Sequence, residues 1–366
     1  MNIYYDNAAT TPILPPPDSH DILGNPSSPH ALGIDAERKL TNAREAISKI
    51  LSCSPSEVIF TSGGTESNNL ALLGFAMANR RNNFTFICQP WEHPSVIEPL
   101  KAIKEQGLGS VMLAPQKEWN SCKSLHRFVA ISHVNHETGD INDITRIAAN
   151  LKNSNSNTII FLDNAQGFCK EDTNLSDIDL LSFSAHKFHG PTGVGGLMLR
   201  NKIRLKPLLY GGSQERNLRP GTENISGIIH TANSAMLIWH QKNENYLHVG
   251  RIKQKLMELA LELPNITINS QTSNTSPYIL NMSFLGLKGE TIVHALSEKG
   301  VSVSMGAACQ SRKKTKSTLE TMGFSQEIAS SSIRFSFSHL NTLEEAVAAK
   351  EIIANCIYHL RKILNC

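Results

Sequence analysis

Short apolar segments alternate with helical segments over most of the first half of this chain. Segments 58–60, 84–88 and 128–132 are apolar and rich in β-branched or aromatic residues, and a stretch with helical periodicity follows each of them. Strands joined by helices form βαβ units, which build a mostly parallel sheet covered on both faces. We therefore expect an α/β domain, to which segments 158–162 and 179–183 contribute two more strands.

The pattern changes after Pro220. A long helical run at 228–261, which we expect Gly250 to interrupt, opens a region typical of a smaller α+β domain. This region continues with strands at 278–284 and 332–337 and helices at 290–299 and 343–363. We assign residues 13–240 to a large domain, and residues 1–12 and 241–366 to a small domain.

Three segments depart from the simple alternation. Residues 195–199 follow the strand at 179–183 too closely for a helical crossover, so we expect them to run antiparallel to it. Residues 153–157 and 269–276 are polar and turn-like, and we expect surface loops there.

Composition limits the classes of function. The formal net charge is only +3, too small to indicate nucleic-acid binding, and no apolar run approaches the ~20 residues of a membrane-spanning helix. The seven cysteines are irregularly spaced without a Cys-x-x-Cys pair, which indicates free thiols in a reducing compartment and no zinc site. Because the N-terminal segment does not resemble a secretory signal, we expect a cytoplasmic protein.

A lysine directly follows one of the predicted strands. Lys187 lies between His186 and Phe188, just past the strand at 179–183 and before a Gly-Pro turn at 190–191. An amine at the end of a buried strand is desolvated, which lowers its pKa and suits it to Schiff-base chemistry. By itself this lysine is equally compatible with an ordinary solvated surface cation.

Three further features fall where other strands end, the edge at which open α/β sheets bind ligands. Residues 61–66 place glycines and hydroxyls at a helix N-terminus, which suits a phosphate or simply a capped helix. Asp163 is either a helix N-cap or the partner of a pyridinium nitrogen, and His93 is either an ordinary loop residue or a ring that stacks on a cofactor. Together with Lys187 they indicate pyridoxal 5′-phosphate (PLP).

With these residues in place, the chain resembles the cysteine desulfurases of the class V, fold-type I group of PLP-dependent enzymes. The resemblance rests on ten blocks in family order, which are residues 6–12, 24–28, 60–68, 92–93, 133–139, 163–166, 182–187, 219–222, 306–309 and 332–336. Each block is a modest indication, but the ordered set is specific and spans nearly the whole chain. It implies a mostly parallel sheet in a large domain and a smaller α+β domain.

The resemblance also implies roles for individual residues. Lys187, His93 and Cys309 would be catalytic, as the cofactor's lysine, a stacked proton shuttle and the nucleophile. Those implied to bind the cofactor are Gly64, Thr65, His136, Asp163, Gln166, Ser184, His186 and Thr222, with Thr222 reaching the phosphate of a neighbouring subunit in a homodimer. Arg334 and Asn7 would bind the substrate, with Arg334 holding its carboxylate.

By this resemblance, L-cysteine gives L-alanine, and its sulfur becomes a persulfide on Cys309. The residues after Cys309, 310–317, are polar and basic, as expected for a mobile loop that delivers sulfur to an acceptor protein. The acceptor would be an iron–sulfur scaffold or a relay for tRNA thiolation. The implied partners include neither a membrane nor nucleic acid bound directly.

The chain departs from the family pattern at several positions. His136 stands where the family has a second asparagine, Ala185 replaces a glycine and Thr192 a lysine, and the link between Pro12 and Gly24 is short and proline-rich. Two alternatives stay open: a selenocysteine or cystine lyase of the same class, and a degenerate homologue that acts as a scaffold for sulfur transfer. Cys309 argues against the first alternative, and the intact set of catalytic residues argues against the second.

Overall fold

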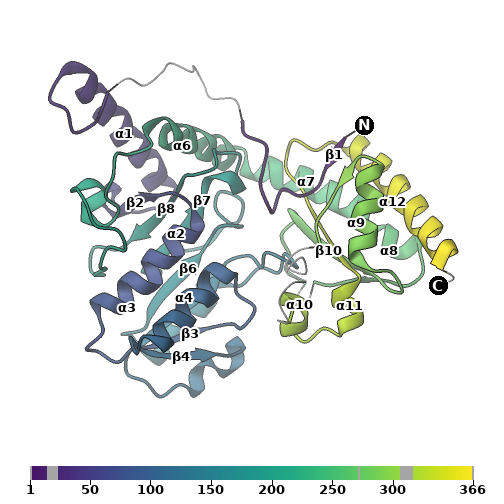
Figure 1. Cartoon of the computed structure of the whole chain (residues 1–366), viewed down its shortest axis with the longest axis horizontal. Coiled ribbons are helices and arrows are strands. Elements are labelled where there is room, and N and C mark those ends of the chain that lie inside the picture. Colours follow the sequence, from purple (N-terminus) through teal and green to yellow (C-terminus); the bar gives the residue numbers. More distant parts are fainter. Residues whose placement is uncertain (1, 15–23, 271–272, 306–315, 365–366) are drawn as a thin grey trace. The chain divides into compact units, whose positions relative to one another are not determined.

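The computed structural model describes residues 2–14, 24–270, 273–305 and 316–364, which form two compact units (Figure 1). The larger unit comprises residues 12–133 and 142–240, and the smaller unit comprises residues 1–11, 134–141 and 241–366. Each unit has its own hydrophobic core.

A seven-stranded sheet forms the centre of the larger unit. Its strands, in spatial order, are β2 (Val58–Thr61), β8 (Gly195–Leu199), β7 (Leu180–Ser184), β6 (Ile159–Asp163), β5 (Arg127–Ser132), β3 (Thr85–Cys88) and β4 (Ser110–Leu113). Only β8 runs antiparallel to its neighbours. Both the mostly parallel sheet and the antiparallel direction of 195–199 are confirmed.

Helices cover both faces of this sheet. Side chains alternate along each strand, so each strand contributes to a core on either face. Val129 and Ile131 of β5 belong to one core, with side chains from α1 (Ala31–Ile50), α5 (Ile144–Ser154) and α6 (Ile225–His240). Phe128 and Ala130 belong to the other core, with α4 (Pro94–Glu105) and a helix formed by α2 (Gly64–Asn69), a π turn (Leu70–Gly74) and α3 (Phe75–Ala78). Strands buried on both faces explain the continuous apolar runs in the sequence.

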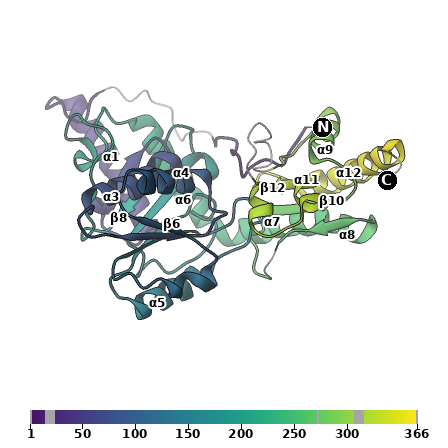
Figure 2. The ribbon, with the colours of Figure 1, turned by 60° about the horizontal axis from the view of Figure 1, so that its bottom comes forward.

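The smaller unit is built on two small sheets. In the first, β10 (Ile279–Phe284) pairs antiparallel with both β12 (Ser332–Ser336) and β9 (Ile266–Ile268). In the second, β1 (Ile3–Tyr4) pairs parallel with β11 (Val301–Ser302). Its helices are α7 (Lys242–Met257), α8 (Leu259–Glu262), α9 (Gly289–Glu298), α10 (Thr318–Thr321), α11 (Gln326–Ser330) and α12 (Leu343–Leu364). Figure 2 shows α12 in yellow, and it packs against α7 and α9.

One expectation about the C-terminal part is wrong, and another holds only in part. The long helical run breaks at Gln241, between α6 and α7, whereas Gly250 lies inside α7. A glycine in a helix costs about 1 kcal/mol but does not end the helix when the neighbouring turns pack well. The segment 269–276 is not simply a surface loop, because Asn269 and Ser276 are buried; Asn269 donates to Asn281 Oδ1 at 2.6 Å.

None of the helices in the described ranges is long and apolar enough to cross a membrane. The apolar residues of the strands are buried inside the two units.

The aromatic packing around β7 predicts a stability effect. Phe183 is fully buried and stacks on Phe168 with ring centroids 4.6 Å apart. Phe183→Ala should lower the free energy of unfolding of the larger unit by about 3–5 kcal/mol, since the ring leaves a cavity that close-packed neighbours fill only in part. All three tryptophans (Trp91, Trp119 and Trp239) belong to this unit, so their fluorescence during urea unfolding measures its stability.

The matched control is Leu125→Ala, because Leu125 is 78% exposed in the same unit and its truncation should change the unfolding free energy little. Equal midpoints for the two variants would contradict this account of the core.

Candidate active site

The carboxyl ends of the parallel strands gather most of the predicted residues at one edge of the sheet in the larger unit. Asp163 is the last residue of β6, and Ser184 is the last residue of β7. Lys187 ends a short 3-10 turn (Ala185–Lys187) that follows β7, and His93 precedes α4 after β3. Because these strands are parallel, their ends meet on the same side of the sheet.

Glycines allow the backbone to approach Ser184 closely. A Cβ added to Gly64 would lie 3.4 Å from Ser184 Cβ, so the first turn of α2 runs directly beside this serine. Gly63 has a φ of 156°, a conformation that favours glycine, and a side chain on Gly195 would lie 2.6 Å from Gly63 Cα. The helix N-terminus and the Ser184 hydroxyl thus lie together, a donor arrangement that fits a phosphate. Thr65 lies exposed in this first turn.

Asp163 is buried and hydrogen-bonded. Its side chain is held by the Asn68 amide, which donates to Oδ2 at 2.8 Å, and by the backbone N–H of Ala165, which donates to Oδ1 at 3.0 Å. No lysine, arginine or histidine of the described ranges forms an ion pair with it. A buried carboxylate needs a compensating charge, so this position fits a protonated ring nitrogen. Gln166 is also buried, in the turn that follows β6.

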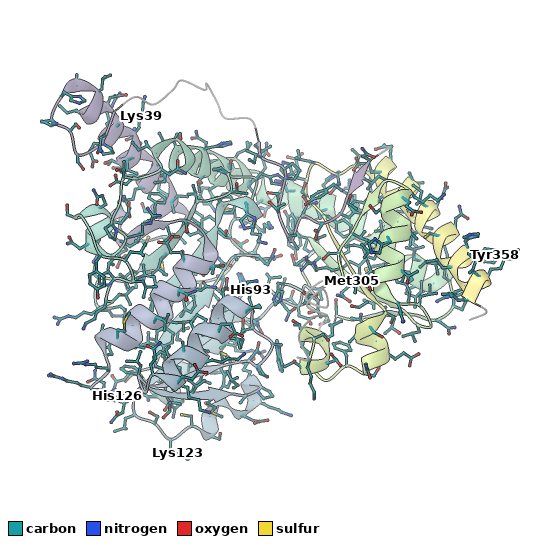
Figure 3. All side chains as sticks on the ribbon, viewed as in Figure 1. Lys39, His93, Lys123, His126, Met305 and Tyr358 are labelled. Carbon is teal, nitrogen blue, oxygen red and sulfur yellow. The ribbon has the colours of Figure 1, made fainter. Side chains whose placement is uncertain are left out.

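His93, labelled in Figure 3, caps the N-terminus of α4. Its Nδ1 accepts the backbone N–H of Ser95 at 3.1 Å and lies 2.7 Å from Ser95 Oγ. The exposed ring is therefore fixed through one nitrogen.

The lysine segment is electropositive. The pKa of His186 is lowered to about 4, by burial and then by the charges of Lys187 and Lys170. The imidazole is consequently neutral at physiological pH and can donate a hydrogen bond without adding a charge. Lys187 itself is half-buried.

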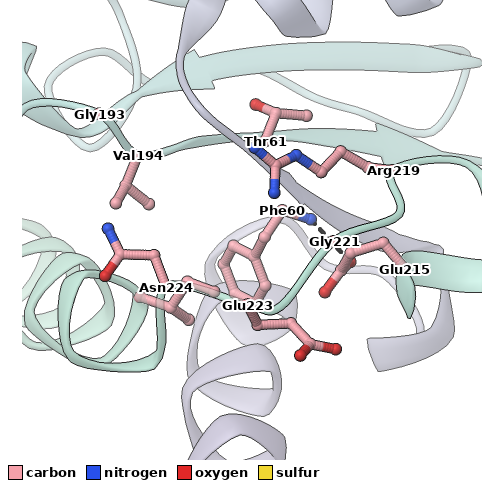
Figure 4. Close-up of a pocket in the computed structure, with 10 residues that line it drawn as sticks. Phe60, Thr61, Gly193, Val194, Glu215, Arg219, Gly221, Glu223 and Asn224 are labelled. Atoms are coloured by element: carbon pink, nitrogen blue, oxygen red, sulfur yellow. Dashed lines mark hydrogen bonds between the residues drawn. The ribbon is translucent and has the colours of Figure 1, made fainter. Parts of the chain in front are cut away.

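The loop that carries Thr222 lines a small pocket of the larger unit (Figure 4). Arg219, Gly221 and Glu223 contribute to the wall of this pocket. Glu215 anchors the loop, since it accepts the backbone N–H of Phe60 at 2.8 Å. Thr222 is exposed beside this pocket.

Arg334 is the centre of a separate cluster in the smaller unit. Its Nη1 donates to the backbone oxygen of His136 at 2.8 Å, and its Nη2 lies 3.3 Å from Asp6 Oδ1. Glu137 lies 3.7 Å from both Arg334 Nη1 and His136 Nε2. Arg334 Nε is buried and has no acceptor among the described residues, so this N–H is not used within the described part of the chain.

Asn7 mainly holds the N-terminal segment in place. Its amide donates to the backbone oxygens of Tyr4 at 3.2 Å and Ser336 at 3.0 Å. Its buried Oδ1 has no donor within the described part of the chain. Cys309 lies outside the described residues.

The larger unit therefore contains nine of the predicted residues: Gly64, Thr65, His93, Asp163, Gln166, Ser184, His186, Lys187 and Thr222. The smaller unit contains Asn7, His136 and Arg334. Sequence reasoning overlooked the residues that hold these groups, namely Asn68, Ser95, Asp6 and Glu137. Asn68 lies within the glycine-rich block 60–68 and Asp6 within the N-terminal block 6–12. Their position in these motifs is the sequence feature that could have identified them.

Comparison with known proteins agrees with this arrangement. The model of the class V aminotransferases matches residues 3–348. A cysteine desulfurase IscS from Buchnera aphidicola subsp. Schizaphis graminum is 35% identical, over 99% of this chain and 94% of the relative. A solved structure described as a NifS-like protein has a TM-score of 0.90 and 31% identity, covering 98% of this chain and all of that one. SspA in complex with cysteine has a TM-score of 0.78 and 28% identity, covering 92% and 99%.

The fold and the matching domain define a class V aminotransferase, a group of PLP-dependent enzymes. Within that family, the chain belongs to the cysteine desulfurases of the IscS/NifS type. The residues of the larger unit fit the cofactor that the family implies, because a buried carboxylate, a lysine, and glycines beside a serine hydroxyl lie along one sheet edge.

Burial of Glu92 beside His93 predicts a pH dependence. Burial is the largest cause that raises the Glu92 pKa to about 8, and the charge of Asp163 raises it further. The backbone N–H of Ser132 donates to both carboxylate oxygens and lowers the pKa, but this effect is smaller. Between the ordinary carboxyl pKa and pH 8 the folded state binds the extra proton, so stability falls as pH rises through this window. Glu92→Gln should remove this fall and gain up to about 5 kcal/mol above pH 8.

Urea unfolding of both proteins from pH 4 to pH 9 measures the difference, which cancels the contributions of other titrating groups. Parallel curves for wild type and Glu92→Gln would contradict a buried, protonated Glu92.

Proposed function

We propose that this protein is a PLP-dependent cysteine desulfurase. It removes sulfur from L-cysteine to give L-alanine and a persulfide on Cys309, which passes to an acceptor for iron–sulfur cluster assembly or tRNA thiolation. The observation that carries the proposal is the meeting of lysine, buried carboxylate and phosphate-type donors at one sheet edge, in a chain similar to cysteine desulfurases over nearly its whole length.

Each group of residues has a part in holding the cofactor. Lys187 would provide the amine for its aldehyde, Asp163 would pair with its ring nitrogen, and Gln166 and His136 would be hydrogen-bond partners for its ring hydroxyl. Gly64, Thr65, Ser184 and His186 would hold its phosphate, and His93 would stack on its ring. When bound, PLP supplies an electron sink for the charge left on the substrate Cα after its proton is removed.

Arg334 binds the substrate carboxylate. Its guanidinium is already oriented by Asp6, by Glu137 and by the backbone oxygen of His136. Orientation before binding reduces the entropy that is lost when the substrate carboxylate docks. The Nε–H, which has no acceptor among the described residues, supports this role, and Asn7 supports it indirectly by fixing the chain beside Ser336.

Cys309 is the nucleophile. Its thiolate forms a bond to the substrate sulfur while the bond between that sulfur and the substrate Cβ breaks, so the sulfur leaves as an enzyme persulfide. The electron pair of the broken bond stays with the substrate, and protonation of Cβ gives the methyl group of L-alanine. Four basic residues follow within 310–317, namely Arg312, Lys313, Lys314 and Lys316. Their positive charge favours an acidic surface on the acceptor protein.

The remaining parts of the proposal concern organisation. The protein acts as a cytoplasmic homodimer in which Thr222 reaches the cofactor phosphate of the other subunit. The sequence predicts residues 13–240 as the cofactor-binding domain and residues 1–12 and 241–366 as the domain that carries the cysteine segment. The compact units differ from this division at Pro12, which lies in the larger unit, and at 134–141, which lie in the smaller unit.

Cys309→Ala tests the persulfide. The variant should keep the absorbance of bound PLP but lose sulfide release from L-cysteine with a reductant by at least about 100-fold, because no thiol accepts the sulfur. Mass spectrometry should find a gain of about 32 Da on Cys309 in the wild type alone. Cys122→Ala, which removes a partly buried thiol of the larger unit, is the control and should behave like wild type. Full activity in Cys309→Ala would favour the lyase alternative.

Lys187→Ala tests the cofactor assignment. Wild-type protein should absorb near ~420 nm, the colour of a pyridoxal Schiff base, and the variant should lack this band. Lys202→Ala is a suitable control, because Lys202 is exposed and pairs with Asp179. A wild type that stays colourless with added PLP but binds sulfur-transfer proteins would favour the scaffold alternative, and an unchanged band in Lys187→Ala would overturn the assignment of the lysine.

A further inference from the structure

Two side chains outside the predicted site join Asp163 to His93 within the larger unit. The Asn68 amide nitrogen donates to Asp163 Oδ2 at 2.8 Å and to Ser95 Oγ at 2.8 Å. Ser95 Oγ in turn lies 2.7 Å from His93 Nδ1. Asn68 is 1% exposed and Ser95 8% exposed, so water does not compete with these hydrogen bonds.

The orientation of the Asn68 amide follows from its neighbours. An amide nitrogen has two hydrogens, and here one points to Asp163 and the other to Ser95. The reversed amide would place Oδ1 against the Asp163 carboxylate, and two acceptors repel each other. Only the observed orientation satisfies the carboxylate.

This orientation fixes the direction of the remaining hydrogen bonds. Ser95 Oγ accepts a hydrogen from Asn68, so its own hydrogen is available for His93 Nδ1. The backbone N–H of Ser95 donates to the same nitrogen at 3.1 Å. With two donors directed at it, Nδ1 is an acceptor, and the proton of a neutral imidazole must sit on Nε2.

We propose that Asn68 and Ser95 are positioning residues that couple Asp163 to His93 and hold His93 in the tautomer with its proton on Nε2. Asn68 orients the carboxylate with one hydrogen and the serine hydroxyl with the other. The ring of His93 therefore presents an N–H, and not a lone pair, on the side away from Ser95. The identity of the group that this N–H contacts rests on the proposed function. The assignment of the tautomer does not.

The tautomer is measured directly in the cofactor-free protein. Histidine labelled with ¹⁵N in the ring gives distinct Nδ1 and Nε2 resonances, and His93→Gln assigns those of His93. Wild type should show an unprotonated Nδ1 and a protonated Nε2. A protonated Nδ1 in the neutral ring would overturn the proposal and leave the proposed function intact, while failure to bind PLP would do the reverse.

Variants distinguish a directed network from simple packing. Ser95→Ala should move the Nδ1 resonance toward the protonated value, and Ser95→Thr, which retains the hydroxyl, should restore it. Asn68→Ala should also move it, although this amide is one hydrogen bond removed from the ring. Ser48→Ala is the matched control, because Ser48 is buried in the same unit and donates to Glu45 O on α1.

Thermal unfolding establishes that each variant is folded before its spectrum is compared. If Asn68→Ala is too unstable, Asn68→Gln, which keeps the amide but displaces it, takes its place. Folded Ser95 and Asn68 variants with a wild-type His93 spectrum would refute the coupling. A shift in Ser95→Ala and in the Asn68 variant, with rescue by threonine and no change in Ser48→Ala, is the expected result.

Discussion

The Asp163 carboxylate, buried at the carboxyl end of β6, is the group on which the rest of the larger unit's site depends. Burying a carboxylate is costly unless hydrogen bonds and a positive charge compensate it. Asn68 and the backbone of Ala165 provide the hydrogen bonds, and a cofactor nitrogen would provide the charge. The position of β6 in the centre of a parallel sheet makes this burial possible, because strands flank it on both sides.

Parallel pairing explains why distant segments converge. The register aligns Asp163 with Ser182 on β7 and with Ser132 on β5. β5 and β6 therefore end at the same level and β7 ends two residues further on, so the residues that follow them leave one edge of the sheet although they are far apart in sequence. For the same reason the ends of the apolar segments are informative in the sequence itself: in an α/β fold, a polar residue that directly follows an apolar strand falls at the ligand-binding edge.

What could be predicted from the sequence was limited by which signals are local. Strand and helix positions follow from periodicity, and the antiparallel β8 follows from the short connection after β7. The break at Gln241 could not be found in this way, because composition indicated Gly250 while packing kept that glycine helical. The roles of Asn68 and Ser95 could not be predicted either, because they depend on hydrogen bonds to partners 27 and 95 residues away in the sequence.

The two units differ in the ionisable groups that surround their buried charged residues. In the smaller unit, Arg334 is surrounded by Asp6 and Glu137, and its Nε–H has no acceptor among the described residues. In the larger unit, the raised pKa of Glu92 keeps this second acid protonated at neutral pH, so it does not add a charge beside Asp163. Burial also keeps His186 neutral, and together with two nearby lysines it lowers the pKa of this imidazole. Because Glu92 and His186 are neutral, Asp163 is the group that a cationic ring would recognise. An ionised Glu92 would weaken the preference of such a ring for Asp163.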